Sequence, residues 1–330
     1  MDTKSKISII TPVFNGEKYL PEVIESVLNQ SGVIIEYVII DDGSTDNSLA
    51  IAEKYSKTFP EIIRVFHQDN HGEASAVNFG LSKITGQYLC VVNSDDPLLG
   101  NHCKKMIDAL RESNAVVAYP DWLMIDNLNR PIRKYKTLDY SKRALLADLV
   151  CIPGPGAVLN VQLISTEKLR DENYRYISDY VTWVKLAKHG DFVRVPEILA
   201  TWRNHEDGAT AVNRGKPIAE ELFRFVEKEL GNIHGTLIPA KWIKSAKSHA
   251  HYHVGVMAIN SKGLNGTRHL IKSFSLKPYP NFGYPSNHRS LVAGALVILG
   301  PIGRAIVKIR NRRRIKNLMS YETDKKLDDR

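Results

Sequence analysis

Residues 88–98 read Tyr-Leu-Cys-Val-Val-Asn-Ser-Asp-Asp-Pro-Leu, and the rest of the chain is understood most easily from this segment. Its first five residues are an apolar run that predicts a buried β-strand, and Pro97 ends the strand because proline cannot donate to a sheet. Asp95 and Asp96 then stand together at the carboxyl end of a buried strand, which is costly unless a positive charge lies beside them. A divalent cation carrying a phosphate would supply that charge, since Mg²⁺ and Mn²⁺ prefer oxygen ligands. A polar turn without a ligand is the alternative for this segment taken alone.

Strand and helix patterns alternate before this segment. Apolar, β-branched runs predict strands, and apolar residues three and four apart predict helices. The predicted strands are 7–11, 33–40 and 62–67, and the predicted helices are 19–31, 47–57 and 73–84. This alternation predicts an α/β fold with a mostly parallel, Rossmann-like sheet and helices on both faces.

Polar segments follow three of the predicted strands, at residues 12–17, 41–46 and 93–96. In open sheets of this kind ligands bind beyond the carboxyl ends of the strands, so we expect the three segments to converge in space. No Gly-x-Gly-x-x-Gly follows an early strand and no phosphate-binding Gly-x-x-x-x-Gly-Lys-Ser/Thr is present, which excludes the usual dinucleotide and P-loop signatures.

The composition is that of an ordinary folded protein. The 330 residues are 43% hydrophobic and 25% charged, which argues against extensive disorder. Three cysteines without a Cys-x-x-Cys pair favour a reducing compartment. Residues 1–6 are polar and predict no signal peptide, and no apolar window is long enough for a membrane span.

The character of the chain changes after residue 215, where helical patterns replace the alternation. We predict an α/β domain over 1–215, a helical extension over 216–288, and an apolar and basic tail over 289–330. Within the first domain, further elements follow Pro97. The predicted elements are a helix at 101–112, a strand at 115–119, a hairpin or meander at 122–136, a helix at 141–150, a Gly- and Pro-rich loop at 151–159, a helix at 178–189, and strands at 192–195 and 198–202.

Five ordered motifs carry a resemblance to a known family. They are Ile-Ile-Thr-Pro-Val-Phe-Asn-Gly (9–16), Val-Ile-Ile-Asp-Asp-Gly-Ser-Thr-Asp (38–46), Gly-Glu-Ala-Ser-Ala-Val-Asn-Phe-Gly (72–80), Asn-Ser-Asp-Asp (93–96) and Ser-Asp-Tyr-Val-Thr-Trp (178–183). Over roughly residues 5–210 the chain resembles the family 2 glycosyltransferases, which have the GT-A fold. The resemblance implies an inverting sugar transfer from a nucleotide diphosphate sugar, with a UDP-sugar expected.

The resemblance also implies a nucleotide site. Pro12 and Phe14 match the floor of the base pocket. Asp42 matches the residue that accepts a hydrogen bond from the uracil imide, with Asp41 as the alternative if the register is off by one. Glu17 is a polar candidate for the ribose, or else a solvated residue of the first helical turn.

A metal site and a catalytic base follow from the same resemblance. Residues 93–96 occupy the place of the family's Asp-x-Asp element, with Asn93 replacing the first acid. Asp96 is expected to bind Mn²⁺ or Mg²⁺ and Asp95 to bind the ribose or assist the metal, although the two roles could be exchanged. Asp179 matches the catalytic base, and Ser178 replaces the Glu that usually precedes it. The alternative for Asp179 is a carboxylate that only stabilises the helix N-terminus.

Two basic residues match an element that follows the catalytic helix in many members. Arg203 and His205 could contact the diphosphate, or could be ordinary surface-loop residues.

The chemistry of sugar transfer calls for these residue types. The acceptor hydroxyl must lose a proton, which a carboxylate base can take, and the diphosphate leaves with developing negative charge, which a divalent metal can stabilise. One base and no second nucleophile predict a single displacement, and therefore inversion.

The tail suggests a membrane surface. Residues 291–309 are apolar and a basic cluster extends over 304–316, which suits an anionic lipid surface. A final core helix is the alternative, and nucleic acid is not expected because the basic cluster lacks interleaved aromatic residues. We therefore expect a cytoplasmic protein, peripheral at the inner face of the cell membrane, acting on a lipid-linked or cell-surface glycan precursor.

Two rival functions share the fold. A sugar nucleotidyltransferase would not need Asp179 and its helix. In a non-catalytic nucleotide- or sugar-binding module, the changes at Asn93 and Ser178 would be signs of lost activity.

Overall fold

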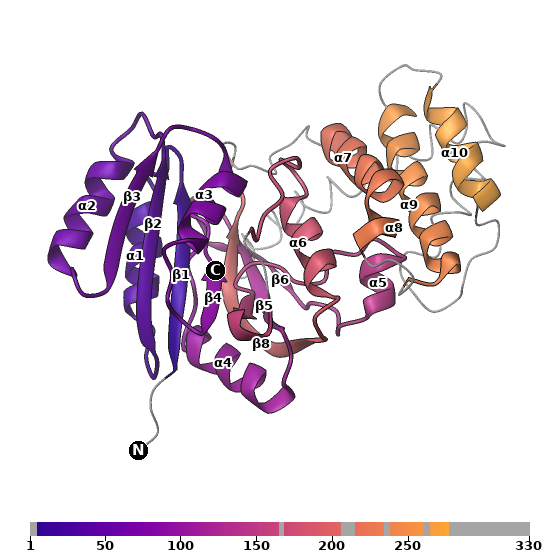
Figure 1. Cartoon of the computed structure of the whole chain (residues 1–330). Coiled ribbons are helices and arrows are strands. Elements are labelled where there is room, and N and C mark those ends of the chain that lie inside the picture. Colours follow the sequence, from indigo (N-terminus) through magenta and orange to yellow (C-terminus); the bar gives the residue numbers. More distant parts are fainter. Residues whose placement is uncertain (1–4, 165–167, 206–214, 234–237, 260–264, 277–330) are drawn as a thin grey trace, which may run out of the picture. The chain divides into compact units, whose positions relative to one another are not determined.

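The computed structural model describes residues 5–164, 168–205, 215–233, 238–259 and 265–276 (Figure 1). Its contacts divide the chain into two units. The first unit comprises Met1–Leu146 and Val150–Arg214, and the second comprises Ala147–Leu149 and Gly215–Arg330. The three-part division predicted from the sequence stays a prediction, because the tail over 289–330 lies outside the described residues.

The first unit is built on a mixed eight-stranded sheet with the strand order β3-β2-β1-β4-β7-β5-β6, in which β8 also pairs with β5. The pairs β1–β2, β2–β3, β1–β4 and β5–β8 are parallel, and β7 and β6 add antiparallel pairs. The strands are β1 (Lys6–Val13), β2 (Ile34–Asp42), β3 (Ile63–Gln68), β4 (Tyr88–Val91), β5 (Val117–Ile125), β6 (Pro131–Tyr135), β7 (Val158–Asn160) and β8 (Phe192–Arg203).

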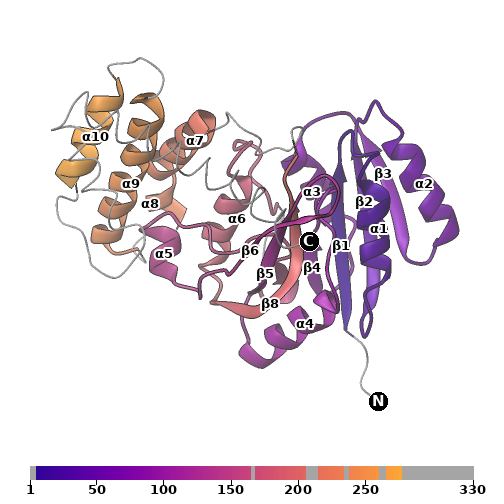
Figure 2. The same cartoon turned by 180° about the vertical axis from the view of Figure 1, so that it is seen from behind.

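Helices cover both faces of this sheet, α3 in front in Figure 1 and α1 in front in Figure 2. On one face Ile9 shares a fully buried apolar cluster with Val23 of α1 and Met106 of α4. On the other face Ile10 meets α3 so closely that a Cβ on Gly80 would lie 2.7 Å from its Cγ2. Strands buried on both faces explain the nearly continuous apolar runs in the sequence. The helices are α1 (Leu20–Leu28), α2 (Ser48–Thr58), α3 (Glu73–Leu81), α4 (His102–Ser113), α5 (Lys142–Leu146) and α6 (Ser178–Leu186), with a 3₁₀ turn at Val161–Leu163.

The predicted fold class is confirmed, whereas the bounds of several elements differ, and the strand predicted at 115–119 is β5 over Val117–Ile125. The strands predicted at 192–195 and 198–202 form one strand, β8, because its pairing with β5 passes from Val195 directly to Ile198 and leaves out the two residues between. The helix predicted over 141–150 ends early, since Leu149 has a φ of +54° that no α-helix contains. The predicted loop 151–159 runs into β7.

The second unit is helical. It contains α7 (Gly215–Lys228), α8 (Leu230–Ile233), α9 (Ala240–Ile259) and α10 (Asn265–Leu276), and α9 packs against both α7 and α10. Fully buried Phe225, Ala246, Ala250 and Leu270 form part of its core. Within the described residues, the apolar content and length of every helix fall short of what crossing a membrane requires.

Candidate active site

The loops after β1, β2 and β4 come together at the carboxyl ends of these strands. The first two interlock, because the Asn15 N–H donates to Ser44 Oγ at 3.0 Å and the Gly16 N–H to Ser48 Oγ at 2.8 Å. The β4 loop joins them, since a Cβ on Gly16 would lie 3.1 Å from Ser94 Oγ. The structure therefore brings the three polar segments predicted from the sequence to one place.

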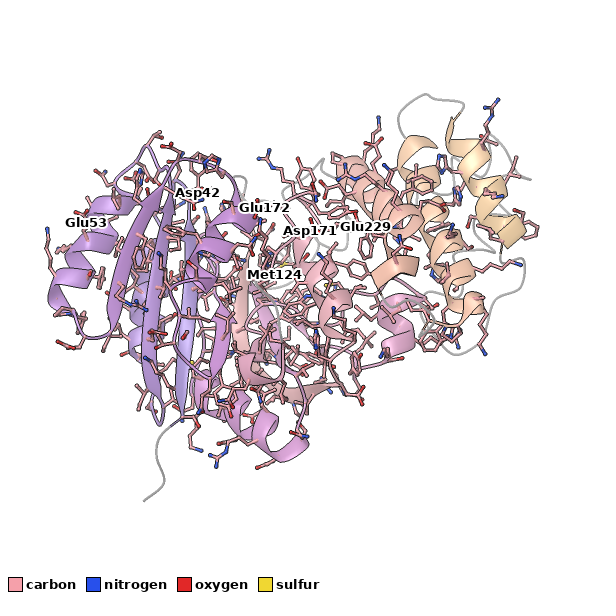
Figure 3. All side chains as sticks on the ribbon, in the orientation of Figure 1. Asp42, Glu53, Met124, Asp171, Glu172 and Glu229 are labelled. Carbon is pink, nitrogen blue, oxygen red and sulfur yellow. The ribbon has the colours of Figure 1, made fainter. Side chains whose placement is uncertain are left out.

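Asp41 and Asp42 are both buried but differ in how their oxygens are used. Asp42 (Figure 3) accepts hydrogen bonds from Gln68 Nε2 at 2.7 Å and from the backbone N–H groups of His71 and Gly72 at 2.9 and 2.8 Å. Asp41 Oδ2 lies 2.8 Å from His67 Nδ1, whereas its Oδ1 is buried without a hydrogen-bond partner. A buried carboxylate oxygen without a donor is costly, so it fits a ligand N–H better than a saturated carboxylate does. The geometry favours Asp41, the alternative, over Asp42.

The remaining predicted nucleotide residues lie on the first loop. Phe14 is 50% exposed, which leaves its ring available to a flat ligand, and Pro12 is buried at the end of β1. Glu17 Oε2 accepts hydrogen bonds from the Asn47 N–H at 3.0 Å and from Asn47 Nδ2 at 2.7 Å. Glu17 therefore ties the β1 loop to the start of α2, a role that neither sequence-based alternative included.

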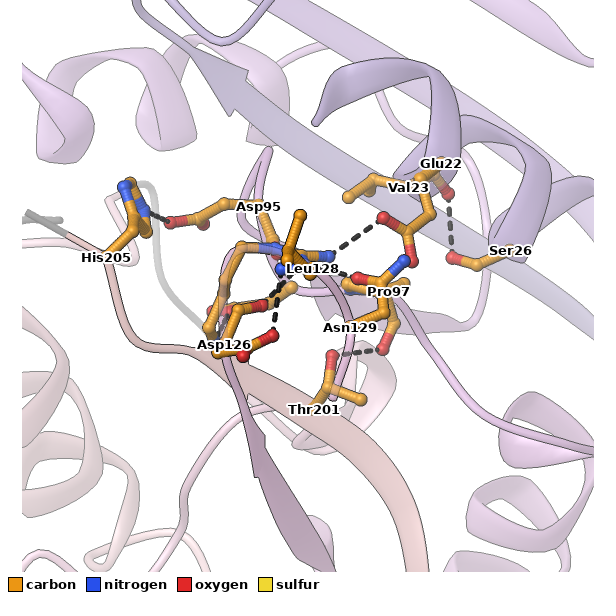
Figure 4. A network of polar contacts seen from close by, with 12 residues as sticks. Glu22, Val23, Ser26, Asp95, Pro97, Asp126, Leu128, Asn129, Thr201 and His205 are labelled. Atoms are coloured by element: carbon orange, nitrogen blue, oxygen red, sulfur yellow. Dashed lines mark hydrogen bonds and ion pairs between the residues drawn. The ribbon is translucent and has the colours of Figure 1, made fainter. Parts of the chain in front are cut away.

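The two acids after β4, Asp95 and Asp96, also differ in burial and in hydrogen-bond partners. Asp95 Oδ2 lies 2.9 Å from His205 Nε2, a contact visible in Figure 4. Asp96 is buried, and its two oxygens accept hydrogen bonds from the Arg203 N–H at 2.7 Å and from Asn93 Nδ2 at 3.0 Å. Burial of Asp96, and next the charge of Asp95, raise the pKa of Asp96 to about 8. Because both Asp96 oxygens already accept hydrogen bonds inside the protein, the structure favours the exchanged assignment, in which Asp95 rather than Asp96 offers its carboxylate to a cation.

These residues fit part of a metal site. Among the described residues, no three His, Cys, Asp or Glu side chains gather closely enough to hold a metal ion by themselves. Asp95 and His205 supply two ligand types, and His205 Nδ1 is buried without a hydrogen-bond partner. Sites for Mg²⁺ and Mn²⁺ often take only one or two protein ligands and complete the coordination with substrate phosphates and water. The pair therefore fits a metal that arrives with a diphosphate.

Arg203 lies in a different environment from the one expected. Its side chain is fully buried, and its guanidinium donates to the Asp95 and Asp126 carbonyl oxygens and to Glu22 Oε2. Because Nε, Nη1 and Nη2 of Arg203 each already donate to a protein acceptor, the diphosphate contact predicted from the sequence does not fit this arrangement.

Asp179 is exposed in the first turn of α6, where the helix N-terminus favours a carboxylate. Its Oδ1 accepts a hydrogen bond from the Tyr180 N–H at 2.7 Å. The neighbouring Ser178 hydroxyl donates to Glu73 Oε2 at 3.2 Å, and Glu73 Oε1 lies 3.4 Å from Arg170 Nε. A second carboxylate, from α3, is therefore held beside the helix that carries Asp179. Sequence reasoning missed Glu73, although it belongs to the motif at 72–80.

Comparisons with known proteins agree with this arrangement. The profile of the family described as Glycosyl transferase family 2 matches residues 8–169. An uncharacterized glycosyltransferase of Rickettsia prowazekii is 30% identical over 236 residues, which are 67% of this chain and 72% of the relative. The putative teichuronic acid biosynthesis glycosyltransferase TuaG of Bacillus subtilis is 26% identical over 244 residues, 72% of this chain and 93% of the relative.

Two solved structures share the fold. The S. aureus TarS 1–349 complex with UDP-GlcNAc superposes with a TM-score of 0.55 at 18% identity, covering 87% of this chain and 79% of that one. The mannosyltransferase PcManGT of Pyrobaculum calidifontis, in complex with GDP-Man and Mn²⁺, gives a TM-score of 0.56 at 15% identity and covers 92% and 87% of the two chains.

Proposed function

Because the chain belongs to glycosyl transferase family 2, and is therefore a glycosyltransferase, we propose that it transfers a sugar from a UDP-sugar, with inversion and with a divalent metal, to a glycan or lipid-linked acceptor. The observation that carries this proposal is the convergence, at the carboxyl ends of β1, β2 and β4, of an exposed aromatic ring, a buried carboxylate with an unpaired oxygen, and an Asp–His pair.

The first two of these features suit a nucleoside. The ring of Phe14 offers a surface on which a base can stack. Asp41 Oδ1 can accept the imide N–H of uracil, which would satisfy an oxygen that otherwise has no partner. Cytosine has no such N–H and would leave that oxygen unpaired. The UDP-GlcNAc complex of TarS supports a UDP-sugar as the donor here.

The Asp95–His205 pair suits a metal bound together with the diphosphate. These two residues would hold Mn²⁺ or Mg²⁺, and when bound the ion would stabilise the charge that develops on the leaving diphosphate. The Mn²⁺ complex of PcManGT supports a divalent metal. Asp96 would keep the loop in place through its contacts with Arg203 and Asn93.

Asp179 is the proposed base. Its carboxylate would accept the proton of the acceptor hydroxyl as that oxygen attacks the anomeric carbon and the bond to the diphosphate breaks. A single displacement by the acceptor needs no enzyme nucleophile and inverts the anomeric centre. A sugar nucleotidyltransferase would have no use for a base on α6, and a binding module would not turn over at all.

The proposal also covers the acceptor of the sugar and the place of the reaction in the cell. The relationship to a putative teichuronic acid biosynthesis enzyme supports a cell-surface glycan precursor, free or lipid-linked, as the acceptor. We place this reaction at the cytoplasmic face of the cell membrane, with the basic tail over 304–316 contacting anionic lipid.

The test is hydrolysis or transfer of a panel of UDP-, GDP- and dTDP-sugars by the full chain, with Mn²⁺ or with EDTA. We expect release of UDP from one donor, lost with EDTA and with Asp95→Ala. Asp108→Ala is the matched control, because Asp108 is a half-exposed acid on α4 whose carboxylate pairs with Lys104. If calorimetry detected no binding of any of the three nucleotides, the donor-site assignment would be overturned.

A further inference from the structure

A buried arginine ties together the elements around the proposed metal site. The side chain of Arg203, the last residue of β8, has no exposed surface. Removing a guanidinium from water is expensive unless its N–H groups find good acceptors. When those acceptors lie on different elements, the fixed donors of the guanidinium can determine the positions of several other groups.

The acceptors of Arg203 come from three other parts of the first unit (Figure 4). Its Nε donates to the Asp95 carbonyl oxygen at 2.8 Å, and its Nη2 donates to Glu22 Oε2 on α1 at 2.9 Å. Its Nη1 donates to the Asp126 carbonyl oxygen at 3.0 Å and to the Asn129 side chain in the turn between β5 and β6. One planar group thus joins α1, the β4 loop and the β5–β6 turn to the end of β8.

The contact with Asp95 is made to its main chain. The Asp95 carboxylate therefore does not pair with the guanidinium, and its Oδ2 lies 2.9 Å from His205 Nε2. The backbone of Arg203 holds the next residue of the loop, since its N–H donates to Asp96 Oδ1. His205, two residues farther along, is oriented by Tyr19, whose ring lies 5.1 Å from the His205 ring and 4.5 Å from the Arg203 guanidinium carbon.

We propose that Arg203 is a positioning residue for the metal ligands: it sets the separation and orientation of Asp95 and His205 without touching the donor. The inference rests on the proposed function, because it assumes that these two residues bind the metal. It replaces the diphosphate contact expected from the sequence. Residues that orient metal ligands typically change metal affinity or activity by about 10- to 100-fold when altered.

Lysine should not substitute for Arg203. An ammonium group keeps the charge but has three donors on one atom. The planar guanidinium instead carries donors on three nitrogens, which point toward acceptors on different elements. Arg203→Lys therefore tests geometry at constant charge. Asn129→Gly removes one acceptor from the exposed turn, and glycine tolerates the left-handed backbone found there, with a φ of +63°.

The experiment measures Mn²⁺ binding to the full chain in the presence of UDP, by electron paramagnetic resonance of the free ion, together with the thermal midpoint. We expect Arg203→Lys to weaken Mn²⁺ binding by roughly 10- to 100-fold. Asn129→Gly should weaken it by a smaller factor with little change in the thermal midpoint. Arg194→Lys is the matched control, since Arg194 is also a largely enclosed arginine of β8, with a side chain 10% exposed, but it pairs with Asp121 and Asp139 rather than with the Asp95 loop. This control should lower the thermal midpoint and leave Mn²⁺ affinity unchanged.

Wild-type Mn²⁺ affinity in both Arg203→Lys and Asn129→Gly would overturn the inference, even if Arg203→Lys lost as much stability as the control. If Arg203→Lys does not fold, Asn129→Gly alone decides, and its unchanged affinity refutes the positioning role. Failure of the proposed function looks different, because the wild-type chain itself would then bind no Mn²⁺ with UDP.

Discussion

Replacing Glu36 by Gln should destabilise the sheet at neutral pH and much less in acid. Glu36 is a buried residue near the amino end of β2, whereas the candidate site lies at the carboxyl ends of the strands. Its carboxylate accepts hydrogen bonds from the Ser8 hydroxyl and from the Thr85 N–H at 2.7 Å. Lys6 Nζ and Arg64 Nη2 lie 3.3 and 2.9 Å from its Oε1. The change from carboxylate to amide therefore removes a charge that several donors surround.

The pKa of Glu36 gives the magnitude. Burial raises this pKa, but the hydrogen bonds from Ser8, Thr85 and Lys6 outweigh it and hold the value at about 2, compared with the ordinary 4.5. The difference corresponds to roughly 3 kcal/mol of folding free energy. Because the folded-state pKa is the lower one, this stabilisation is present above pH 4.5 and is lost as the pH falls from 4.5 toward 2. About half of it should remain at pH 3.5.

Urea unfolding of wild type and Glu36→Gln at pH 7 and pH 3.5 measures this contribution. We expect the difference in the free energy of unfolding between the two proteins to be roughly 3 kcal/mol at pH 7 and about half that at pH 3.5. Glu53→Gln serves as the control, because Glu53 is an exposed residue of α2 and should give a small difference at both pH values. An equal difference at the two pH values for Glu36→Gln would refute the argument, since it would mean that the ionised form gains nothing from its neighbours.

Three further predictions concern the candidate site. Asp179→Asn should lower turnover by roughly 10²- to 10⁴-fold while leaving UDP affinity unchanged in calorimetry, and nearly normal turnover would exclude Asp179 as the base. Asp41→Asn should weaken UDP binding by roughly 1–3 kcal/mol, as read by the same titration, and a larger loss with Asp42→Asn at an unchanged thermal midpoint would reverse that assignment. Asp95→Ala should abolish the Mn²⁺ stimulation of donor hydrolysis, whereas Asp96→Ala should chiefly lower the thermal midpoint; a midpoint unaffected by Asp96→Ala would argue against its role in holding the loop.

The fold could be predicted from the sequence because the patterns that define its strands and helices are formed by residues close together in the chain. The period of the apolar residues distinguishes the strands from the helices before residue 98, and glycine and proline mark where they end. The location of the candidate site followed from a general property of parallel sheets, in which polar residues after successive strands meet at one edge. The interlocked loops around Gly16 and Ser94 agree with that expectation.

The choice between adjacent carboxylates could not be predicted, because it depends on donors that are distant in the sequence. Asp42 is saturated by Gln68, His71 and Gly72, which lie 26 to 30 residues later, and nothing near Asp42 in the sequence reveals this. Asp96 is held by the N–H of a residue 107 positions away. In each pair the two acids look equivalent in the sequence, and only the folded chain determines which carboxylate remains available to a ligand.

Arg203 shows why charge alone is a poor guide to a ligand. A basic residue after the helix that carries Asp179 suggests a phosphate contact, yet the Nη2 atom of Arg203 finds its carboxylate partner 181 residues earlier, on α1. The cation is still useful to an anionic substrate if it holds Asp95 by the carbonyl oxygen and leaves the carboxylate beside His205. Direct neutralisation of Asp95 by the same guanidinium would instead have competed with a metal for that carboxylate. The burial of Arg203 and the availability of Asp95 are therefore two consequences of one hydrogen-bond pattern.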